Sequence, residues 1–327
     1  MPPTRAAALL GGRSVNARTH VPVLLDEVMQ ALDIKPDAIV VDATYGRGGH
    51  AGEILKRLGE GGRLLLLDRD PEAIADARAR FGDDARVVIE QLRFSRLREA
   101  CDRHGLTGRV AALLFDLGVS SPQLDEGRRG FSFRQSGPLD MRMDPGRGRP
   151  AADWVNTADE AELAEVIRTY GEERHARRIA RAIVRARAEA PITDTARLAE
   201  IVARAVPARE RHKDPATRTF QAIRLHINEE LAELEAALPQ AVDVLAPGGR
   251  LAVISFHSLE DRRVKQFMRD ASEPPAVPRG LPAPPAFTPR LRRIGRAIRA
   301  GDAEVARNPR ARSAVLRVAE RVGVAHA

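Results

Sequence analysis

The chain has 327 residues, 43% of them hydrophobic and only 4% aromatic, which allows an aliphatic core in one large or two modest domains. Its formal net charge of +8 permits a polyanionic partner, although arginine-rich codon usage would give the same total. The single cysteine, Cys101, excludes an internal disulfide and a cysteine zinc cluster, and no apolar run approaches the ~18 residues of a membrane helix. The apolar run at 6–10 is too short for a signal peptide, so we expect a cytoplasmic protein without a metal site or a membrane contact.

Short apolar runs alternate with helical patterns through the first 116 residues. The runs are continuous, which is typical of parallel strands that are covered on both faces. The helical patterns have ordinary end signals, such as Asp70-Pro71 at a start and Gly105 at an end. This alternation predicts an α/β fold with an open, doubly wound sheet. Strands are predicted at 38–42, 63–68, 86–90, 110–116 and, after a long interval, 250–256.

The interval after Asp116 reads as loop to about Pro150 and then as helices. We therefore predict a sheet-containing core from two segments, 1–140 and 216–327, with a helical insert at 141–215. The last helix of this region, near 217–238, is expected to return to the sheet. The proline-rich stretch at 273–290 should be extended, and a late strand is expected within 311–322, at or near the sheet edge.

Two basic features could bind phosphates. In the insert, Arg174, Arg178, Arg181 and Arg185 step by four, three and four residues, so a helix would place them on one face. The face either contacts RNA or is simply solvated. From Arg262 to Arg321, fifteen basic residues stand against five acidic ones, which indicates either a docking surface for phosphates or a solvated tail.

A glycine loop follows the first predicted strand. Residues 46–51, GRGGHA, fit the dinucleotide pattern G-x-G-x-x-A, and Asp68 follows about twenty residues later, where a strand-end acid accepts hydrogen bonds from ribose hydroxyls. An NAD-dependent dehydrogenase therefore remains an alternative. However, Asp42 stands directly before the loop, where its charge would repel a pyrophosphate and suit a cation. S-adenosyl-L-methionine combines an adenosine for Asp68 with a positive sulfonium, so it is the favoured cofactor.

The fourth predicted strand ends in Asp116-Leu-Gly-Val-Ser-Ser-Pro-Gln123. Polar residues at this end of a strand lie where open α/β sheets bind substrates. The acceptor-rich turn suits an exocyclic amine, whose hydrogens need acceptors and whose proton must be removed. We therefore name Asp116, Ser120 and Ser121 as candidate catalytic residues.

Several long motifs resemble the bacterial 16S ribosomal RNA cytosine-N4 methyltransferase family (the MraW/RsmH type). They extend from His20 almost to the end of the chain. The most specific are RGFSFRQSGPLDMRMD and ISFHSLEDRRVK, and the others include HVPVLLDEV, DATYGRGGHAG, LDRDPEAI, FDLGVSSPQLD, YGEERHARRIARAIV and PATRTFQAIRLHINEEL.

The resemblance implies a class I methyltransferase (Rossmann-like) doubly wound sheet with a helical insertion domain for substrate recognition. It also implies methyl transfer to a cytosine in the decoding region of small-subunit RNA. A non-catalytic RNA-binding assembly factor is the second alternative. By position in the motifs, the resemblance assigns cofactor contacts to Gly48, Gly49, His50, Asp68, Phe94, Asp116 and Gln123.

Overall fold

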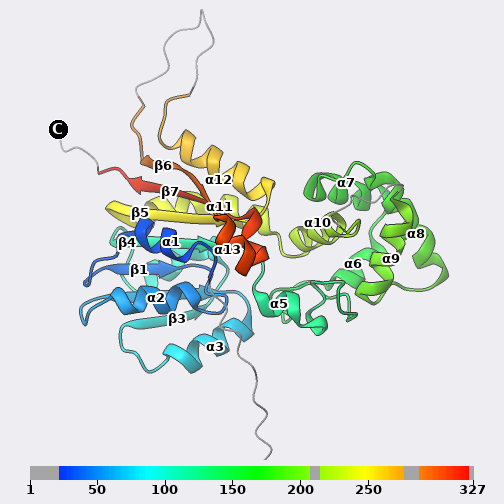
Figure 1. Cartoon of the computed structure of the whole chain (residues 1–327), viewed down its shortest axis with the longest axis horizontal. Helices are drawn as coiled ribbons and strands as arrows, with labels where there is room; N and C mark the ends of the chain where they lie inside the picture. The colour runs from blue at the N-terminus through cyan, green and yellow to red at the C-terminus, as the bar shows by residue number, and fades with distance from the viewer. Residues whose placement is uncertain (1–21, 207–213, 276–286, 324–327) are drawn as a thin grey trace, which may run out of the picture.

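The computed structural model describes residues 22–206, 214–275 and 287–323, which form a sheet-containing core with a helical lobe beside it (Figure 1). The core holds a seven-stranded sheet in the order β3-β2-β1-β4-β5-β7-β6. The first five strands in this order run parallel, and β7 runs antiparallel to both of its neighbours. The strands are β1 Ile39–Asp42, β2 Arg63–Asp68, β3 Val87–Gln91, β4 Val110–Asp116, β5 Leu245–Ser255, β6 Leu291–Arg299 and β7 Val315–Arg321.

Helices cover both faces of this sheet. The core helices are α1 Leu25–Leu32, α2 Gly49–Arg57, α3 Pro71–Phe81, α4 Leu97–Arg103, α5 Ser121–Asp125, α11 Glu230–Val244, α12 Ser258–Asp270 and α13 Asp302–Arg307. Three short 3-10 turns join them, η1 Phe94–Arg96, η2 Gly127–Arg129 and η3 Pro309–Ser313. One hydrophobic cluster joins the sheet to α4, α11 and α12, and a second joins it to α1, α2 and α3.

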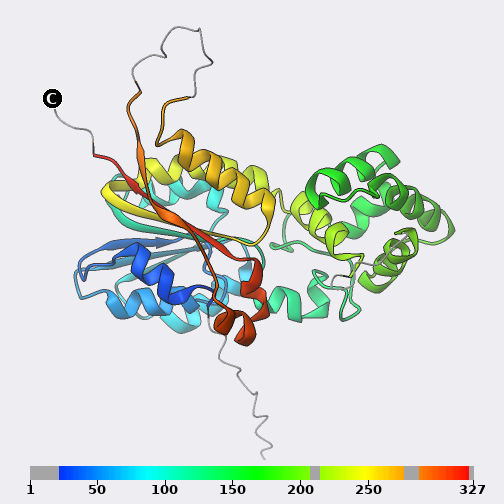
Figure 2. The same cartoon turned by 45° about the horizontal axis from the view of Figure 1, so that its top comes forward.

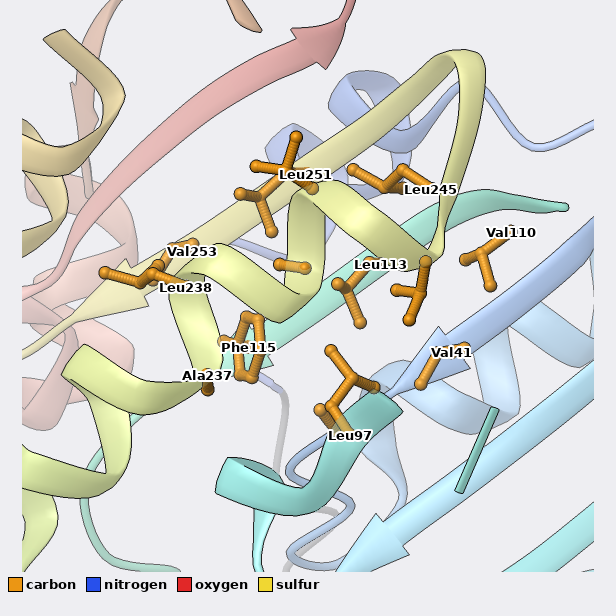
Figure 3. Close-up of a cluster of buried hydrophobic side chains, with 14 of the residues drawn as sticks. Val41, Leu97, Val110, Leu113, Phe115, Ala237, Leu238, Leu245, Leu251 and Val253 are labelled. Atoms are coloured by element: carbon orange, nitrogen blue, oxygen red, sulfur yellow. The ribbon is translucent and has the colours of Figure 1, made fainter. Parts of the chain in front are cut away.

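The central strand β4 explains why the predicted strands are continuous apolar runs. Leu113 and Phe115 point into the first cluster, shown in Figure 3, whereas Ala112 and Leu114 point into the second. Because successive side chains alternate between faces and both faces are covered, every position before Asp116 is apolar. The doubly wound α/β sheet predicted from these runs is confirmed.

The helical lobe contains α6 Ala151–Thr157, α7 Glu160–Gly171, α8 Ala176–Glu189, α9 Thr195–Ala205 and α10 Thr217–Ile227. Its hydrophobic cluster extends from Leu139 to Ile223. The lobe therefore extends past the predicted end of the insert at residue 215, because Phe220 and Ile223 of α10 belong to the hydrophobic cluster of the lobe, where α10 packs mainly on α7.

Two further elements differ from the sequence-based expectation. The single helix expected near 217–238 is two helices, since Glu229 adopts a left-handed backbone with φ of 55° and separates α10 from α11. As expected, the second of them, α11, packs on the sheet. The strand β6 was not predicted. It is the outer strand beside β7, and almost all of its side chains are exposed, so it has no apolar run that could mark it.

Two expectations fall largely on residues outside the described ranges. These are the run at 6–10 and most of the proline-rich stretch, of which 276–286 are not described. Within the three described ranges, no helix is both long enough and apolar enough to cross a membrane.

Candidate active site

Three acidic side chains end adjoining strands at the carboxyl edge of the sheet. Asp42 ends β1, Asp68 ends β2 and Asp116 ends β4, and these strands are neighbours in the order β2-β1-β4. Open α/β sheets bind their ligands at this edge. The acids predicted from the sequence are therefore brought together next to α5, on the side of the core that faces the helical lobe (Figure 1).

The glycine loop is held closely by its own neighbours. Gly48 has φ of +65°, and a Cβ atom added there would lie 2.5 Å from the ring of Tyr45. A Cβ atom added at Gly49 would lie 2.3 Å from the ring of Pro22. Packing within the protein thus already requires both glycines, and their predicted contact with the cofactor stays a prediction.

Asp68 connects the end of β2 to the glycine loop. Its Oδ2 accepts a hydrogen bond from the Gly46 backbone N–H at 2.8 Å, and its Oδ1 accepts one from the Asp70 N–H at 2.8 Å. Burial raises the pKa of Asp68 to about 6. Each carboxylate oxygen can accept more than one hydrogen bond, so ribose hydroxyls could still bind here.

His50, which is 5% exposed, lies between Asp116 and the chain before α1. Its Nε2 lies 3.1 Å from the carbonyl oxygen of Val23, and its Nδ1 lies 3.5 Å from Oδ2 of Asp116. Both ring nitrogens thus face acceptors, which a doubly protonated imidazolium satisfies. Burial alone would lower the pKa of His50, but the hydrogen bond and charge of Asp116, with the charge of Asp42, raise it overall. The cofactor contact of His50 stays a prediction.

Asp42, at the end of β1, is 1% exposed. Burial raises its pKa to about 7, although the positive charge of His50 opposes the rise. Thr44 bridges Asp42 and Asp116, because its N–H donates to Asp42 Oδ1 at 3.1 Å and its Oγ1 accepts from the Asp116 N–H at 2.6 Å. The sequence pattern identified the two acids but not Thr44, which only the pairing of β1 with β4 places between them.

Two buried oxygen atoms at this edge have no hydrogen-bond partner among the described residues. They are Oδ1 of Asp116 and Oγ of Ser255, which ends β5 beside β4. Buried polar atoms are normally paired, so these two oxygens have unused hydrogen-bonding capacity at this edge. Ser255 was not predicted, although a polar residue that ends the apolar run LAVIS was a usable signal.

The loop after β4 lies against the glycine loop, since a Cβ atom added at Gly46 would be 3.9 Å from Cβ of Ser120. Ser120 and Ser121 are half-buried here and begin α5. The Gln123 amide accepts from the Ser120 N–H at 2.9 Å and donates to Oδ2 of Asp70 at 2.7 Å. Gln123 therefore holds the loop in place, and its predicted cofactor contact would have to use its second N–H.

Phe94 lies in η1, directly after β3. Its ring is partly exposed and meets Phe115 edge-to-face, with 5.7 Å between the ring centroids. An aromatic ring that is anchored on one side and open on the other could contact an adenine, as predicted. No contact within the protein tests this role.

A buried arginine missed by sequence reasoning joins the site to the helical lobe. Arg129 is 4% exposed and donates to Asp70 at 2.9 Å and to Glu72 at 3.1 Å. It also donates to the carbonyl oxygens of Arg142 and Met143 at 3.2 and 3.0 Å. Its position in the RGFSFRQSGPLDMRMD motif was a signal, but the sequence alone could not show that the guanidinium is buried.

Asn228, between α10 and α11, contacts the same connection between core and lobe. It is 1% exposed, and its side chain donates to the carbonyl of Met141 at 2.7 Å and accepts from the Met143 N–H at 2.8 Å. Arg69, which follows Asp68, donates to the Asn228 carbonyl at 2.7 Å. The two chain segments that connect the core and the lobe are thus hydrogen-bonded to each other, and Arg69 joins them to the end of β2.

The predicted arginine face of the insert is only partly on a helix. Arg178, Arg181 and Arg185 are exposed on α8, whereas Arg174 lies in the turn before it, because the helix begins at Ala176. The expectation of a four-residue helical face is therefore corrected to three. Arg181 Nε lies 3.6 Å from Oε1 of Glu160, so part of this charge is neutralised within the lobe.

The described ranges contain no group of three or more His, Cys, Asp or Glu side chains that could hold a metal ion. Cys101 is buried in α4, and burial raises the pKa of its thiol to about 12, so it is not poised to act as a nucleophile.

Comparisons with known proteins agree with this geometry. The family model described as "MraW methylase family" matches residues 17–322. The ribosomal RNA small subunit methyltransferase H of Thioalkalivibrio sulfidiphilus (strain HL-EbGR7) is 59% identical over 308 residues, covering 94% of this chain and 98% of that protein. The protein of the same name from Thiobacillus denitrificans (strain ATCC 25259 / T1) is 60% identical over 310 residues, covering 94% and 99%.

Among solved structures, an rRNA methylase from Streptococcus thermophilus overlaps 91% of this chain and 93% of its own at 13% identity and a TM-score of 0.39. The seven-stranded sheet and the family match confirm the Rossmann-like, class I methyltransferase core predicted from the resemblance. The chain belongs to the MraW methylase family.

Proposed function

We propose that this protein transfers a methyl group from S-adenosylmethionine to the exocyclic N4 of a cytosine in 16S ribosomal RNA of the small subunit. The observation that carries the proposal is the cluster of Asp42, Asp68 and Asp116 around the glycine loop at the carboxyl edge. The printed names of the two relatives support the small-subunit RNA as substrate. The choice of cytosine N4 rests on the acceptor-rich loop after β4 and on the family resemblance.

The residues present fit the cofactor. When bound, S-adenosylmethionine supplies an electrophilic methyl group on a positively charged sulfur. Asp68 can accept hydrogen bonds from ribose hydroxyls, and the glycine loop beside it lacks the side chains that would block access. The unpaired Oδ1 of Asp116 and the buried charge of Asp42 favour a cationic ligand over a pyrophosphate. This last point disfavours the dehydrogenase alternative.

Within the chain, Asp116 is the candidate acceptor of the proton that the amine must lose. The lone pair of a cytosine amine is delocalised into the ring, so the enzyme has to orient the nitrogen and accept its hydrogens. Asp116 can hold that proton on a carboxylate oxygen, while Ser120 and Ser121 offer further acceptors. His50 keeps Asp116 in place through the 3.5 Å contact between Nδ1 and Oδ2. The target base must leave its stack or be presented unpaired.

We further propose that the helical lobe recognises the RNA. The exposed arginines of α8, with Arg174 before it, would contact phosphates of the same ribosomal RNA. The sequence predicted a helical insert at 141–215. Because α10 belongs to the lobe, we place the end of the lobe near Asn228. A ribosomal substrate would place the protein in the cytoplasm.

The test uses purified protein, radiolabelled S-adenosylmethionine and unmethylated small subunits. Nuclease mapping should locate the label at one cytosine, and mass spectrometry of the nucleosides should identify N4-methylcytidine. Label on another atom would contradict the choice of N4. Tight binding of the RNA without any transfer would instead support the non-catalytic alternative, and reduction of a nicotinamide would support the dehydrogenase.

A further inference from the structure

An arginine-rich surface lies at the rim of the candidate active site and has no role in the function proposed so far. We define the rim arginines as Arg296 and Arg299 on β6, Arg307 at the end of α13 and Arg312 in η3, all exposed. Since β7 is antiparallel to both β5 and β6, β6 runs in the same direction as β5. Arg299, at the end of β6, therefore lies at the carboxyl edge, and Figure 2 shows α13 and η3 at that edge beside α5.

The rim arginines carry uncompensated charge. Residues 290–313 include eight arginines and only two acids. Other arginines of this region are paired, as Arg292 is with Glu320 at 2.7 Å and Arg310 is with Asp125 at 2.5 Å. The four rim arginines, by contrast, have no hydrogen bond or ion pair from their side chains to any described residue.

Two contacts join this surface to α5 and to the start of α1. The ion pair between Arg310 and Asp125 joins η3 to α5, the helix that begins at Ser121. Glu304 of α13 accepts a hydrogen bond from the Leu24 N–H at 2.8 Å, which joins α13 to the start of α1. The rim therefore does not depend on the helical lobe for its position. The rim thus lies on the same edge of the sheet as Asp116, beside the helix that follows the loop after β4.

We propose that the rim arginines bind the phosphate backbone of the substrate RNA next to the target base. The proposal rests on the proposed function, because it names a second contact surface for the same RNA. Arginine suits this task, since its planar guanidinium binds phosphate oxygens through two parallel hydrogen bonds and keeps its charge. Such contacts position the nucleic acid and carry no base specificity.

A different role, protection of the edge strand, accounts for only part of the surface. Charged side chains and bulges commonly prevent an edge strand from pairing with another chain, and β6 has both, with Gly295 at φ of +64° in its irregular segment. This explanation could apply to Arg296 and Arg299. It does not apply to Arg307 and Arg312, which lie outside the strand.

The experiment measures how the affinity for labelled single-stranded RNA depends on salt concentration, by fluorescence anisotropy. A variant with all four rim arginines changed to Gln should show a log–log slope that is shallower by roughly 2 to 3, because about 0.7 counterions are released per phosphate contact on single strands. If this variant does not fold, the double variants R296Q/R299Q and R307Q/R312Q should each lose roughly half of that amount. Calorimetry with S-adenosylhomocysteine checks that the core remains folded.

The control removes the same charge from the opposite edge of the sheet. Four exposed arginines of that edge, Arg57, Arg63, Arg78 and Arg109, are changed to Gln. The control should keep the wild-type slope. An unchanged slope in the rim variant, or an equal decrease in the control, overturns the proposal. The proposal is also overturned if the rim variant self-associates while its monomer keeps the wild-type slope. That result would support protection of the edge strand as the only role of these arginines. Failure of the proposed function can be told apart from failure of this proposal. In that case the wild-type protein would transfer no methyl group to small subunits, whatever the salt dependence of RNA binding.

Discussion

Replacing Asp42 with Asn should stabilise the protein at neutral pH. The side chain keeps its size and its acceptor for the Thr44 N–H, but loses a charge that is buried at 1% exposure. Burial raises the pKa of Asp42 from its ordinary 3.8 to about 7. Each tenfold change in proton affinity is worth about 1.4 kcal/mol, so ionising this carboxyl costs the folded state about 4 kcal/mol relative to the unfolded chain.

The sign of the effect follows from the direction of the pKa change. Between about pH 4 and pH 7 the folded state keeps a proton that the unfolded state has released, so the stability of the wild-type protein falls as the pH rises. The D42N variant lacks this loss. The difference in the free energy of unfolding between D42N and the wild type should be small near pH 4. It should grow by about 1.4 kcal/mol per pH unit and level off above pH 7. Below about pH 6, His50 is protonated in both states and adds no slope of its own.

The assay is urea unfolding of both proteins at pH 4.5, 5.5, 6.5 and 8, with D37N as a control that removes an exposed carboxylate. The control should shift stability by a similar small amount at every pH. A stability difference between D42N and the wild type that does not change with pH would refute the electrostatic reasoning. The same variant should lose affinity for the cationic S-adenosylmethionine more than for S-adenosylhomocysteine, because the buried charge at Asp42 is what favours a cation.

Three further outcomes are expected. D68A should weaken S-adenosylmethionine binding by about 1.5–3 kcal/mol in calorimetry, and unchanged affinity in a folded variant would contradict the ribose contact. C101A should still produce N4-methylcytidine, because Cys101 is buried with its pKa raised to about 12, and 5-methylcytidine from the wild-type protein would reverse this assignment. R129M should lower the free energy of unfolding by about 3–5 kcal/mol, since it leaves Asp70 buried without its cation, and a loss near zero in urea unfolding would show that the pair is dispensable.

The sequence by itself determined the architecture of the core and the acids that end its strands at the candidate site. The continuous apolar runs of β1, β2 and β4 marked strands covered on both faces, and an acid at each strand end marked the binding edge. These signals are local, because the alternation of side chains and the end of a strand are written in a few consecutive residues. The glycine loop and the resemblance of the longer motifs then indicated the ligand class.

Only the tertiary structure decided which side chains act together. The strand β6 has no apolar run because it is an exposed edge strand, so it is recognisable only by its pairing with β7. His50 meets Asp116, and Asn228 meets Met141, across 66 and 87 positions of sequence. The burial of Arg129 likewise depends on segments that converge only in the folded chain. Contacts of this kind arise from the packing of distant segments, and no pattern within one segment encodes them.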